Sequence, residues 1–302
     1  MLVAVSGGAD SLALLLLAHA ALGDRAHAAT VDHGLRAESA GEVAYVARLC
    51  ADRGIPHASL KGDIPKRVER TANLSSRARA LRYRLLEAHA DAIGARHIAT
   101  AHHADDQLET LVMRLNRGAG VAGLASIRAV SGRVIRPLLD WRRAELAAIV
   151  AQCGIVPVDD PTNRDDRFDR ARLRKTLAGA DWIDRDRAAL SVRYLADAED
   201  ALAWATDLAA DRALHLTEGE ATLAGVSIPD EIRRRLVERC VRHVDPFAEC
   251  RGPAIARVIA ALEGGEQVML GAVLCSVARH PLAGAGEPSV WRFVPAPPRR
   301  AH

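Results

Sequence analysis

Six consecutive residues near the start of the chain, Ser6 to Ser11, have the types and spacing of an anion-binding turn. They lie between apolar runs at 2–5 and 12–22, which predict a buried strand followed by a helix. Adjacent glycines let the backbone approach an anion, and the free N–H groups at a helix start favour negative charge. The turn therefore predicts phosphate binding by Ser6, Gly7, Gly8, Ala9, Asp10 and Ser11.

Asp10 could serve this turn in two ways, because it could cap the following helix or orient a Mg²⁺ ion held on a pyrophosphate. An ordinary capped glycine turn is the alternative to a phosphate site. A Walker-type loop is excluded, since no Gly-Lys-Ser or Gly-Lys-Thr follows the glycines.

Ionisable side chains also gather after the predicted strand at 26–31. Asp32 could hold a metal or a cationic substrate, and Arg36 could reach a phosphate. A glycine-containing turn that caps the next helix is the alternative.

A second such cluster, which includes His102 and Asp106, follows the predicted strand at 97–101. These two residues are four apart and would share a helix face if the helix has begun by then. The cluster lacks the thiols or third imidazole of a structural zinc site, so we expect a role in magnesium binding or proton transfer. Solvated histidines beside an aspartate-capped helix are the alternative.

Basic residues are concentrated in a few segments of the chain. Between Lys66 and Arg84 seven residues are basic and one is acidic, which favours a polyanionic partner over a merely solvated helix face. A Gly-x-Gly-x-x-Gly sequence at 118–123 follows a predicted helix rather than a strand, so it indicates a flexible basic loop instead of a dinucleotide site. The candidate phosphate and nucleic-acid contacts are Arg36, Arg77, Arg79, Arg82, Arg114, Arg117, Asn163, Arg170 and Arg174.

Strand and helix patterns alternate along the first half of the chain. Strands are predicted at 2–5, 26–31, 57–60, 97–101 and near 133–136, and helices at 11–22, 38–53, 73–92, 104–116 and 141–152. This alternation predicts an α/β fold with a parallel, doubly wound sheet. Ligands of such sheets lie at the carboxyl ends of the strands, where every cluster above is found.

The second half of the chain follows another pattern. Helices are predicted at about 168–178, 185–213, 229–243 and 253–263, with strand-like stretches at 221–228 and 264–278. We therefore expect a catalytic domain over 1–185, a small α+β domain over 190–294 and a disordered tail over 295–302.

Composition limits the class of protein. The chain has 302 residues, of which 49% are apolar, and its five cysteines form no Cys-x-x-Cys pair, as is typical of a reducing compartment. The apolar run at 12–22 is too short to span a bilayer, and no basic leader precedes the first strand. We expect a cytoplasmic protein without a membrane partner.

Taken together, the motifs resemble the tRNA(Ile)-lysidine synthase family of PP-loop ATP pyrophosphatases. The matching segments stand in the order of the family: SGGADS (6–11), VDHGLR (31–36), SRARALRYRLL (76–86), AHHADDQLET (101–110), RLNRGAGVAGL (114–124), RPLL (136–139) and DDPTNRDDRFDRARLRK (159–175). They cover about residues 1–178. The first motif occurs in many ATP pyrophosphatases, whereas the second and fourth together are much more specific.

The resemblance implies an adenine nucleotide alpha-hydrolase-like fold and a carbon–nitrogen ligase that uses ATP and Mg²⁺. Members adenylate the wobble cytidine in the CAU anticodon of tRNA(Ile), and L-lysine then displaces AMP to give lysidine. The resemblance also implies catalytic roles for Asp32, His102 and Asp106, without deciding which one takes the proton of lysine. It is consistent with a homodimer. We also expect the domain over 190–294 to bind tRNA, although the resemblance does not extend to that domain.

Three other classes of protein share some of these features. A tRNA thiolase of the same superfamily generally needs a cysteine pair or an iron–sulfur cluster, and no two cysteines here are closer than Cys240 and Cys250. Amide-forming relatives share the glycine turn but not the AHHADDQLET segment. A non-catalytic ATP-binding or RNA-binding protein would tend to lose some of Asp10, Asp32 and Asp106, all of which are present.

Overall fold

The computed structural model describes residues 1–32, 39–62, 74–158, 169–224, 227–278 and 290–297, with the side chains of 74–76 excepted. The chain divides into two compact units, Met1–Ala196 and Asp197–His302. The division falls inside one continuous helix, α8 (Arg185–Ala213), and so comes later than the boundary expected between residues 185 and 190. The predicted tail begins within the last strand, which ends at Pro295, and residues 298–302 of that tail lie outside the described residues.

The first unit is built on a mostly parallel sheet in the order β3-β2-β1-β4-β6-β5. Its strands are β1 (Leu2–Ala4), β2 (His27–Asp32), β3 (His57–Lys61), β4 (Ile98–Ala99), β5 (Val130–Ser131) and β6 (Val134–Ile135). Neighbouring strands pair parallel except the short edge strand β5, which pairs antiparallel with β6. The chain adds strands on one side of β1 and then crosses to β4 on the other side, so the topological switch point lies between β1 and β4.

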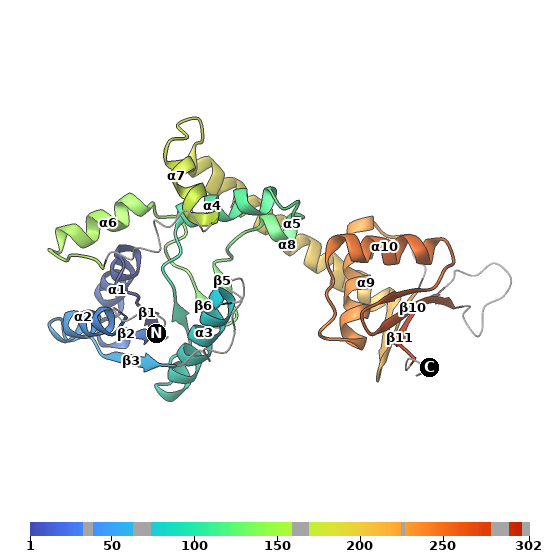
Figure 1. Ribbon diagram of the computed structural model, residues 1–302, viewed down its shortest axis with the longest axis horizontal. Helices are drawn as coiled ribbons and strands as arrows, with labels where there is room; N and C mark the ends of the chain where they lie inside the picture. The colour runs from blue at the N-terminus through green and yellow to red at the C-terminus, as the bar shows by residue number, and fades with distance from the viewer. Residues whose placement is uncertain (33–38, 63–73, 159–168, 225–226, 279–289, 298–302) are drawn as a thin grey trace. The chain divides into compact units, whose positions relative to one another are not determined.

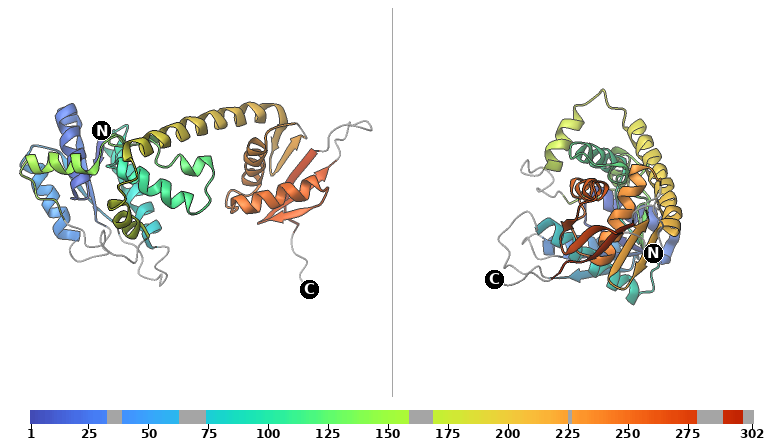
Figure 2. Two further views of the ribbon diagram at one scale, coloured as in Figure 1. Left: turned by 90° about the horizontal axis from the view of Figure 1, so that it is seen from above. Right: turned by 90° about the vertical axis from the view of Figure 1, so that its right-hand side faces the viewer.

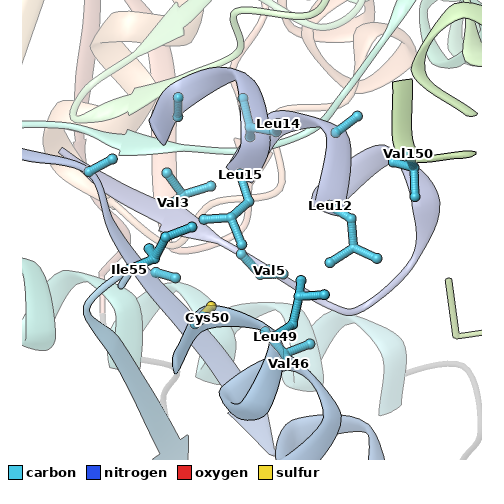
Figure 3. Packing of buried hydrophobic residues seen from close by; sticks show 14 of the residues in the cluster. Val3, Val5, Leu12, Leu14, Leu15, Val46, Leu49, Cys50, Ile55 and Val150 are labelled. Carbon is cyan, nitrogen blue, oxygen red and sulfur yellow. The ribbon is translucent and has the colours of Figure 1, made fainter. Parts of the chain in front are cut away.

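Helices cover both faces of this sheet because successive strand residues point to opposite sides. Val3 and Val5 belong to a core that they form with α1 (Ala9–Leu22), α2 (Ser39–Ala51) and α6 (Arg143–Gln152), as Figure 3 shows. Leu2, on the other face, packs in a second core against Leu86 of α3 (Leu74–Ala92). The predicted α/β, doubly wound fold is confirmed, with an antiparallel edge strand that was not predicted.

The remaining elements of the first unit include α4 (Ala104–Leu115), α5 (Val121–Leu124) and α7 (Asp169–Ala178), together with a 3₁₀ turn at Gly23–Arg25. α4 begins at Ala104 with His103 as its N-cap residue, so His102 precedes the helix. The condition under which His102 and Asp106 would share one helix face, that the helix has begun by His102, is therefore not met. The basic glycine-rich segment after α4 was expected to be a loop, but it contains the short helix α5.

The second unit combines an antiparallel sheet with helices. Its strands, in the order β7-β8-β11-β10-β9, are β7 (Leu214–Thr217), β8 (Glu220–Ala224), β11 (Val290–Pro295), β10 (Val273–Ala278) and β9 (Val268–Leu270). Helices α9 (Asp230–Val244) and α10 (Gly252–Glu263) pack on one face of it around the buried Phe293 (Figures 1 and 2). The helices and β8 to β10 match the expected α+β pattern, whereas β7 and β11 were not predicted. Across the described part of the chain, no helix combines the length and the apolar character of a membrane span.

Candidate active site

The turn between β1 and α1 holds its shape through backbone geometry and two hydroxyl groups. Gly7 has a φ of +85°, and a Cβ added there would lie 3.0 Å from Cγ2 of Val158. The Oγ of Ser11 accepts a hydrogen bond from the backbone N–H of Ser6 at 3.1 Å and donates one to the carbonyl oxygen of Gly8 at 2.9 Å. The first glycine is thus required both by conformation and by space, and the turn is ordered before any ligand binds.

A cavity of about 450 Å³ opens beside this turn, at the carboxyl ends of β1, β2 and β4. Its place beside the switch point is where ligands of doubly wound sheets are found. Among the predicted site residues, those that line it are Ser6, Gly8, Asp10, Ser11, Arg79, Arg82, His102, Asp106, Arg170 and Arg174. The structure therefore brings the turn, the cluster after β4 and basic residues of α3 and α7 to one cavity.

His103 lies at the centre of the acidic part of the site. Its side chain is 1% exposed, and its Nε2 lies 3.5 Å from Oδ2 of Asp10 and 3.5 Å from Oδ2 of Asp106. Its Nδ1 lies 3.6 Å from Oδ2 of Asp105. Burial alone would lower the pKa of His103, but the hydrogen bond to Asp10 and the charges of the three carboxylates raise it. Sequence reasoning named His102 and missed His103, since two adjacent histidines give no sign of which one is turned inward.

Asp106 presents a partly desolvated carboxylate to the cavity. Its Oδ2 accepts a hydrogen bond from the backbone N–H of His103 at 3.1 Å, and its Oδ1 accepts one from Nη2 of Arg170 at 3.2 Å. Burial raises the pKa of Asp106, although the charges of His103 and Arg170 act in the opposite direction. A carboxylate in such a setting holds a proton more readily than a solvated one.

His102 lies in the opposite electrostatic environment. Its Nδ1 is hydrogen-bonded to Oγ1 of Thr100 at 3.0 Å. Burial, together with the positive charges of Arg136, Arg79 and Arg170, lowers the pKa of His102 to about 3. The ring is therefore neutral at physiological pH.

Arg170 and Arg174 share one face of α7, as their spacing predicts, and both bind Glu109 of α4. Nε of Arg170 lies 2.8 Å from Oε2 of Glu109, and Nε of Arg174 lies 2.7 Å from Oε1. Burial would raise the pKa of Glu109, but these hydrogen bonds and charges lower it. The two arginines thus join α7 to α4, and their contact with a phosphate stays a prediction. Glu109 was not recognised from the sequence.

Other predicted residues lie at the edge of the site or away from it. Asp32, at the end of β2, accepts a hydrogen bond from Oγ of Ser39 at 2.7 Å. Arg79 is positioned with its guanidinium 5.0 Å from the ring centroid of Tyr83. Arg77 is exposed on α3.

Two predicted nucleic-acid contacts, Arg114 and Arg117, have protein partners in the structure, and their contact with tRNA stays a prediction. Arg114 donates hydrogen bonds to the carbonyl oxygens of Gly123 and Ser126, and so supports the segment that contains α5. Arg117, on the surface, lies 3.8 Å from the carboxylate of Asp169. Arg36 and Asn163 were also predicted as contacts and lie outside the described residues.

Asp10 has the chemistry needed to hold a magnesium ion that arrives with a nucleotide. Its Oδ1 is buried and, within the described residues, accepts no hydrogen bond. No group of three or more His, Cys, Asp or Glu side chains that could hold a metal is found in the same part of the chain. This donor set fits Mg²⁺, which is usually bound through one or two carboxylates, water and substrate phosphates.

Comparison with known proteins identifies the family. The model of the PP-loop domain family matches residues 1–180. The chain is 42% identical over 307 residues to the tRNA(Ile)-lysidine synthase of Novosphingobium aromaticivorans, covering 99% of this chain and 90% of the relative. For the tRNA(Ile)-lysidine synthase of Zymomonas mobilis the identity is 39%, with coverage of 99% and 89%. The chain belongs to the tRNA(Ile)-lysidine synthase family.

This membership confirms the resemblance found in the motifs, and the PP-loop match supports the use of ATP. Among solved structures, the U34-tRNA thiolase NcsA from Methanococcus maripaludis with its [4Fe-4S] cluster superposes with a TM-score of 0.54. It covers 65% of this chain and 72% of its own, at 17% sequence identity, which is a likeness of fold alone.

Three of the five cysteines of this lysidine synthase family member are buried and do not suit thiolation, whereas Cys153 is exposed and Cys250 is half-buried. Cys50 lies in a core of the first unit, and Cys240 and Cys275 lie in the core of the second. Burial raises the pKa of the Cys50 thiol to about 11, and it also raises the pKa values of Cys240 and Cys275. Buried protonated thiols are neither nucleophiles nor cluster ligands, which argues against the thiolase alternative.

Proposed function

We propose that this chain forms lysidine, by joining the ε-amine of L-lysine to C2 of the wobble cytidine in the CAU anticodon of tRNA(Ile). ATP is consumed, and AMP and pyrophosphate are released, so the reaction is a carbon–nitrogen ligation. The observation that carries this proposal is a single cavity in a lysidine synthase family member, where the Ser6–Ser11 turn meets Asp106 and Arg170.

The turn and the start of α1 supply the phosphate site of the first half-reaction. The cytosine 2-oxygen attacks the α-phosphorus of ATP, the bond to the bridging oxygen breaks, and pyrophosphate leaves with the electron pair. Backbone N–H groups at a helix start stabilise the charge that develops on the leaving group. Mg²⁺, when bound, would neutralise part of that charge, and Asp10 would hold it through its unpaired Oδ1.

The second half-reaction needs a proton acceptor, because lysine's amine has a pKa of about 10.4 in water and is protonated at neutral pH. We assign this role to Asp106, whose carboxylate lines the cavity and whose pKa is raised by burial. Asp106 takes a proton from the ammonium group, the lone pair freed on nitrogen forms the bond to C2, and the bond from C2 to the adenylate oxygen breaks so that AMP leaves with its electron pair. The neutral ring of His102 would form a hydrogen bond with the cytosine base or with the lysine amine. Asp32 would hold the lysine cation near the end of β2.

The basic residues of α3 fit the tRNA partner. An anticodon loop is single-stranded, so its wobble base can be turned into a cavity while arginines contact the flanking phosphates. Arg79 and Arg82 line the cavity, and Arg77 is exposed on the same helix, two residues before Arg79. The tRNA-binding role of residues 190–294, a homodimer and a cytoplasmic location stay predictions from the sequence.

The test is incorporation of labelled lysine into unmodified tRNA(Ile) with Mg²⁺-ATP, followed by mass analysis of the wobble nucleoside. We expect lysidine and AMP in equal amounts. An Asp106→Asn variant should lose at least about 100-fold in rate while keeping the melting temperature of the wild type. Release of AMP without lysine in the nucleoside would overturn the proposed reaction, and wild-type turnover of a folded Asp106→Asn variant would overturn the role of Asp106.

A further inference from the structure

Arg143, a residue not singled out by the sequence motifs, lies at a junction between two cavities. It is the first residue of α6 and lines the main cavity beside the Ser6–Ser11 turn. It also lines a second cavity of about 150 Å³, together with Asp105, Glu109 and Arg185. Its backbone N–H donates a hydrogen bond to Oδ2 of Asp105 at 2.9 Å, so the main chain at this position is fixed to α4.

The charge of Arg143 is not matched by a carboxylate in the described part of the chain, unlike the charges of the arginines near it. Arg142 binds Asp186 through Nε at 2.9 Å, Arg185 binds Asp105, and Arg174 binds Glu109 at 2.7 Å. Among the described residues, no hydrogen bond or ion pair is found for the guanidinium of Arg143. An exposed cation beside a phosphate-binding turn is available to an anionic ligand.

Packing fixes the position of Arg143 relative to the turn. Leu146 and Val150 of α6 are buried in the same core as Leu12 and Leu15 of α1, the helix that the turn begins. The start of α6 is therefore held on the helix that receives the phosphates. A guanidinium held there can bind two oxygens of one phosphate group at once, which an ammonium cannot.

We propose that Arg143 binds the pyrophosphate leaving group of the adenylation step. Negative charge grows on pyrophosphate as the bond from the α-phosphorus to the bridging oxygen breaks, and a cation that meets this charge lowers the barrier. The inference rests on the proposed adenylation, but not on the identity of the base or amine that accepts the adenylate. It gives Arg143 a role separate from that of Arg170 and Arg174, both of which bind Glu109.

The experiment is calorimetric binding of Mg²⁺-pyrophosphate to the full chain and to three variants. We expect Arg143→Gln to weaken binding about tenfold and Arg143→Lys to weaken it less, since the charge remains but the paired contact is lost. Arg142→Gln is the matched control, because it is the adjacent residue, binds Asp186 at the surface and lines neither cavity. It should bind pyrophosphate like the wild type, and all variants should melt at the wild-type temperature.

Binding needs neither tRNA nor lysine, so the result remains interpretable if lysidine formation itself is not observed. Wild-type pyrophosphate affinity in Arg143→Gln would overturn the assignment. An equal loss in Arg142→Gln would also overturn it, by showing a general effect at the start of α6. If Arg143→Gln raised the KM for lysine or tRNA and left the pyrophosphate affinity unchanged, Arg143 would bind another anion, the lysine carboxylate or a tRNA phosphate. The assignment to pyrophosphate would then be overturned.

Discussion

Two adjacent imidazoles of the site, His102 and His103, have opposite charge environments. His103 is surrounded by the carboxylates of Asp10, Asp105 and Asp106, whereas His102 faces arginines. The motif alone predicts that an imidazole and a carboxylate meet here, but the backbone at the start of α4 decides which ring turns inward. The chemical difference between these neighbours therefore became visible only in three dimensions.

We predict that His102 stays neutral over the whole physiological range. Burial and nearby arginines lower its pKa to about 3, so its ring should show no titration near the ordinary value of 6.5. The unfolded chain takes up this proton near 6.5 and the folded chain does not, so His102 lowers stability as the pH falls below that value. NMR of the histidine rings, assigned with a His102→Gln variant, tests this; a midpoint near 6.5 for His102 would contradict it.

Gly7 is predicted to be irreplaceable for steric reasons as well as conformational ones. In Gly7→Ala the alanine must adopt a positive φ, which is unfavourable for an L-residue, and its Cβ would lie 3.0 Å from Cγ2 of Val158. We expect a loss of about 2–4 kcal/mol in the free energy of unfolding and a clear loss of ATP affinity. Calorimetry and denaturant unfolding measure the two effects.

The matched control is Gly54→Ala, where φ is +66° and no atom lies within 4 Å of an added Cβ. This variant should lose only about 1–2 kcal/mol from backbone strain and keep the ATP affinity of the wild type. If both variants bound ATP equally well, the close approach at Gly7 would have no bearing on the phosphate site.

At the scale of elements, α7 is held on α4 mainly by the buried carboxylate of Glu109, with Asp106 as a further partner. The four-residue spacing of Arg170 and Arg174 correctly placed both on one helix face, and the sequence suggested phosphates as their partners. The structure shows Glu109 as their main protein partner, a residue distant in sequence and hidden inside the AHHADDQLET segment, while their contact with a phosphate stays a prediction. Helical periodicity shows which residues share a face, but it does not show what that face meets.

We predict that Glu109→Gln loosens α7. The variant removes the main carboxylate partner of both guanidinium groups and leaves them only their contacts with Asp106. Since both arginines are partly solvated, we expect a loss of about 1–3 kcal/mol at neutral pH. Amide exchange should become faster over Asp169–Ala178 and stay unchanged in α6. Equal exchange rates in α7 for wild type and variant would contradict this role.

The same pair has a defined pH dependence. The pKa of Glu109 is lowered in the folded chain from its ordinary value of 4.5. The contribution of Glu109 to the stability of the folded chain is therefore complete above pH 4.5. It is lost as the pH falls through the folded pKa, where wild type and Glu109→Gln should become equally stable. A difference that persists undiminished in strong acid would contradict the ionic basis of the contact.

The strands that sequence reasoning missed, such as β5 and β11, give no periodic pattern of their own or depend on pairing with distant segments. β5 is a two-residue edge strand joined to β6 through Gly132, whose φ is +57°, and it is too short for a periodic pattern. β11 pairs with β8 and β10, and residues 279–289 separate it from the end of β10. The central strands β1 and β2 were found because their apolar residues reflect burial inside the sheet, whereas very short or late strands depend on non-local pairing.

For the whole molecule, the sequence indicated two parts, with an expected boundary between residues 185 and 190 that precedes the division between the compact units. The division at Ala196 falls inside α8, a continuous helix that carries none of the glycine or proline residues that mark a linker. The hydrophobic cores nevertheless separate cleanly. Two clusters contain only residues of the first unit, and a third contains only residues of the second.

Separate cores predict that damage to the second unit leaves nucleotide binding intact. Phe293 is fully buried in the core of that unit, so Phe293→Ala should lower the stability of the unit by about 3–5 kcal/mol. Mg²⁺-ATP affinity, measured by calorimetry below the unfolding temperature of the variant, should match the wild type, because the whole cavity belongs to the first unit. The reciprocal variant Leu12→Ala removes a fully buried side chain of α1, just after the turn, and should weaken ATP binding as it destabilises the first unit. If Phe293→Ala reduced ATP affinity as much as Leu12→Ala, the two cores would be energetically coupled, and the phosphate site would depend on the whole chain rather than on the first unit.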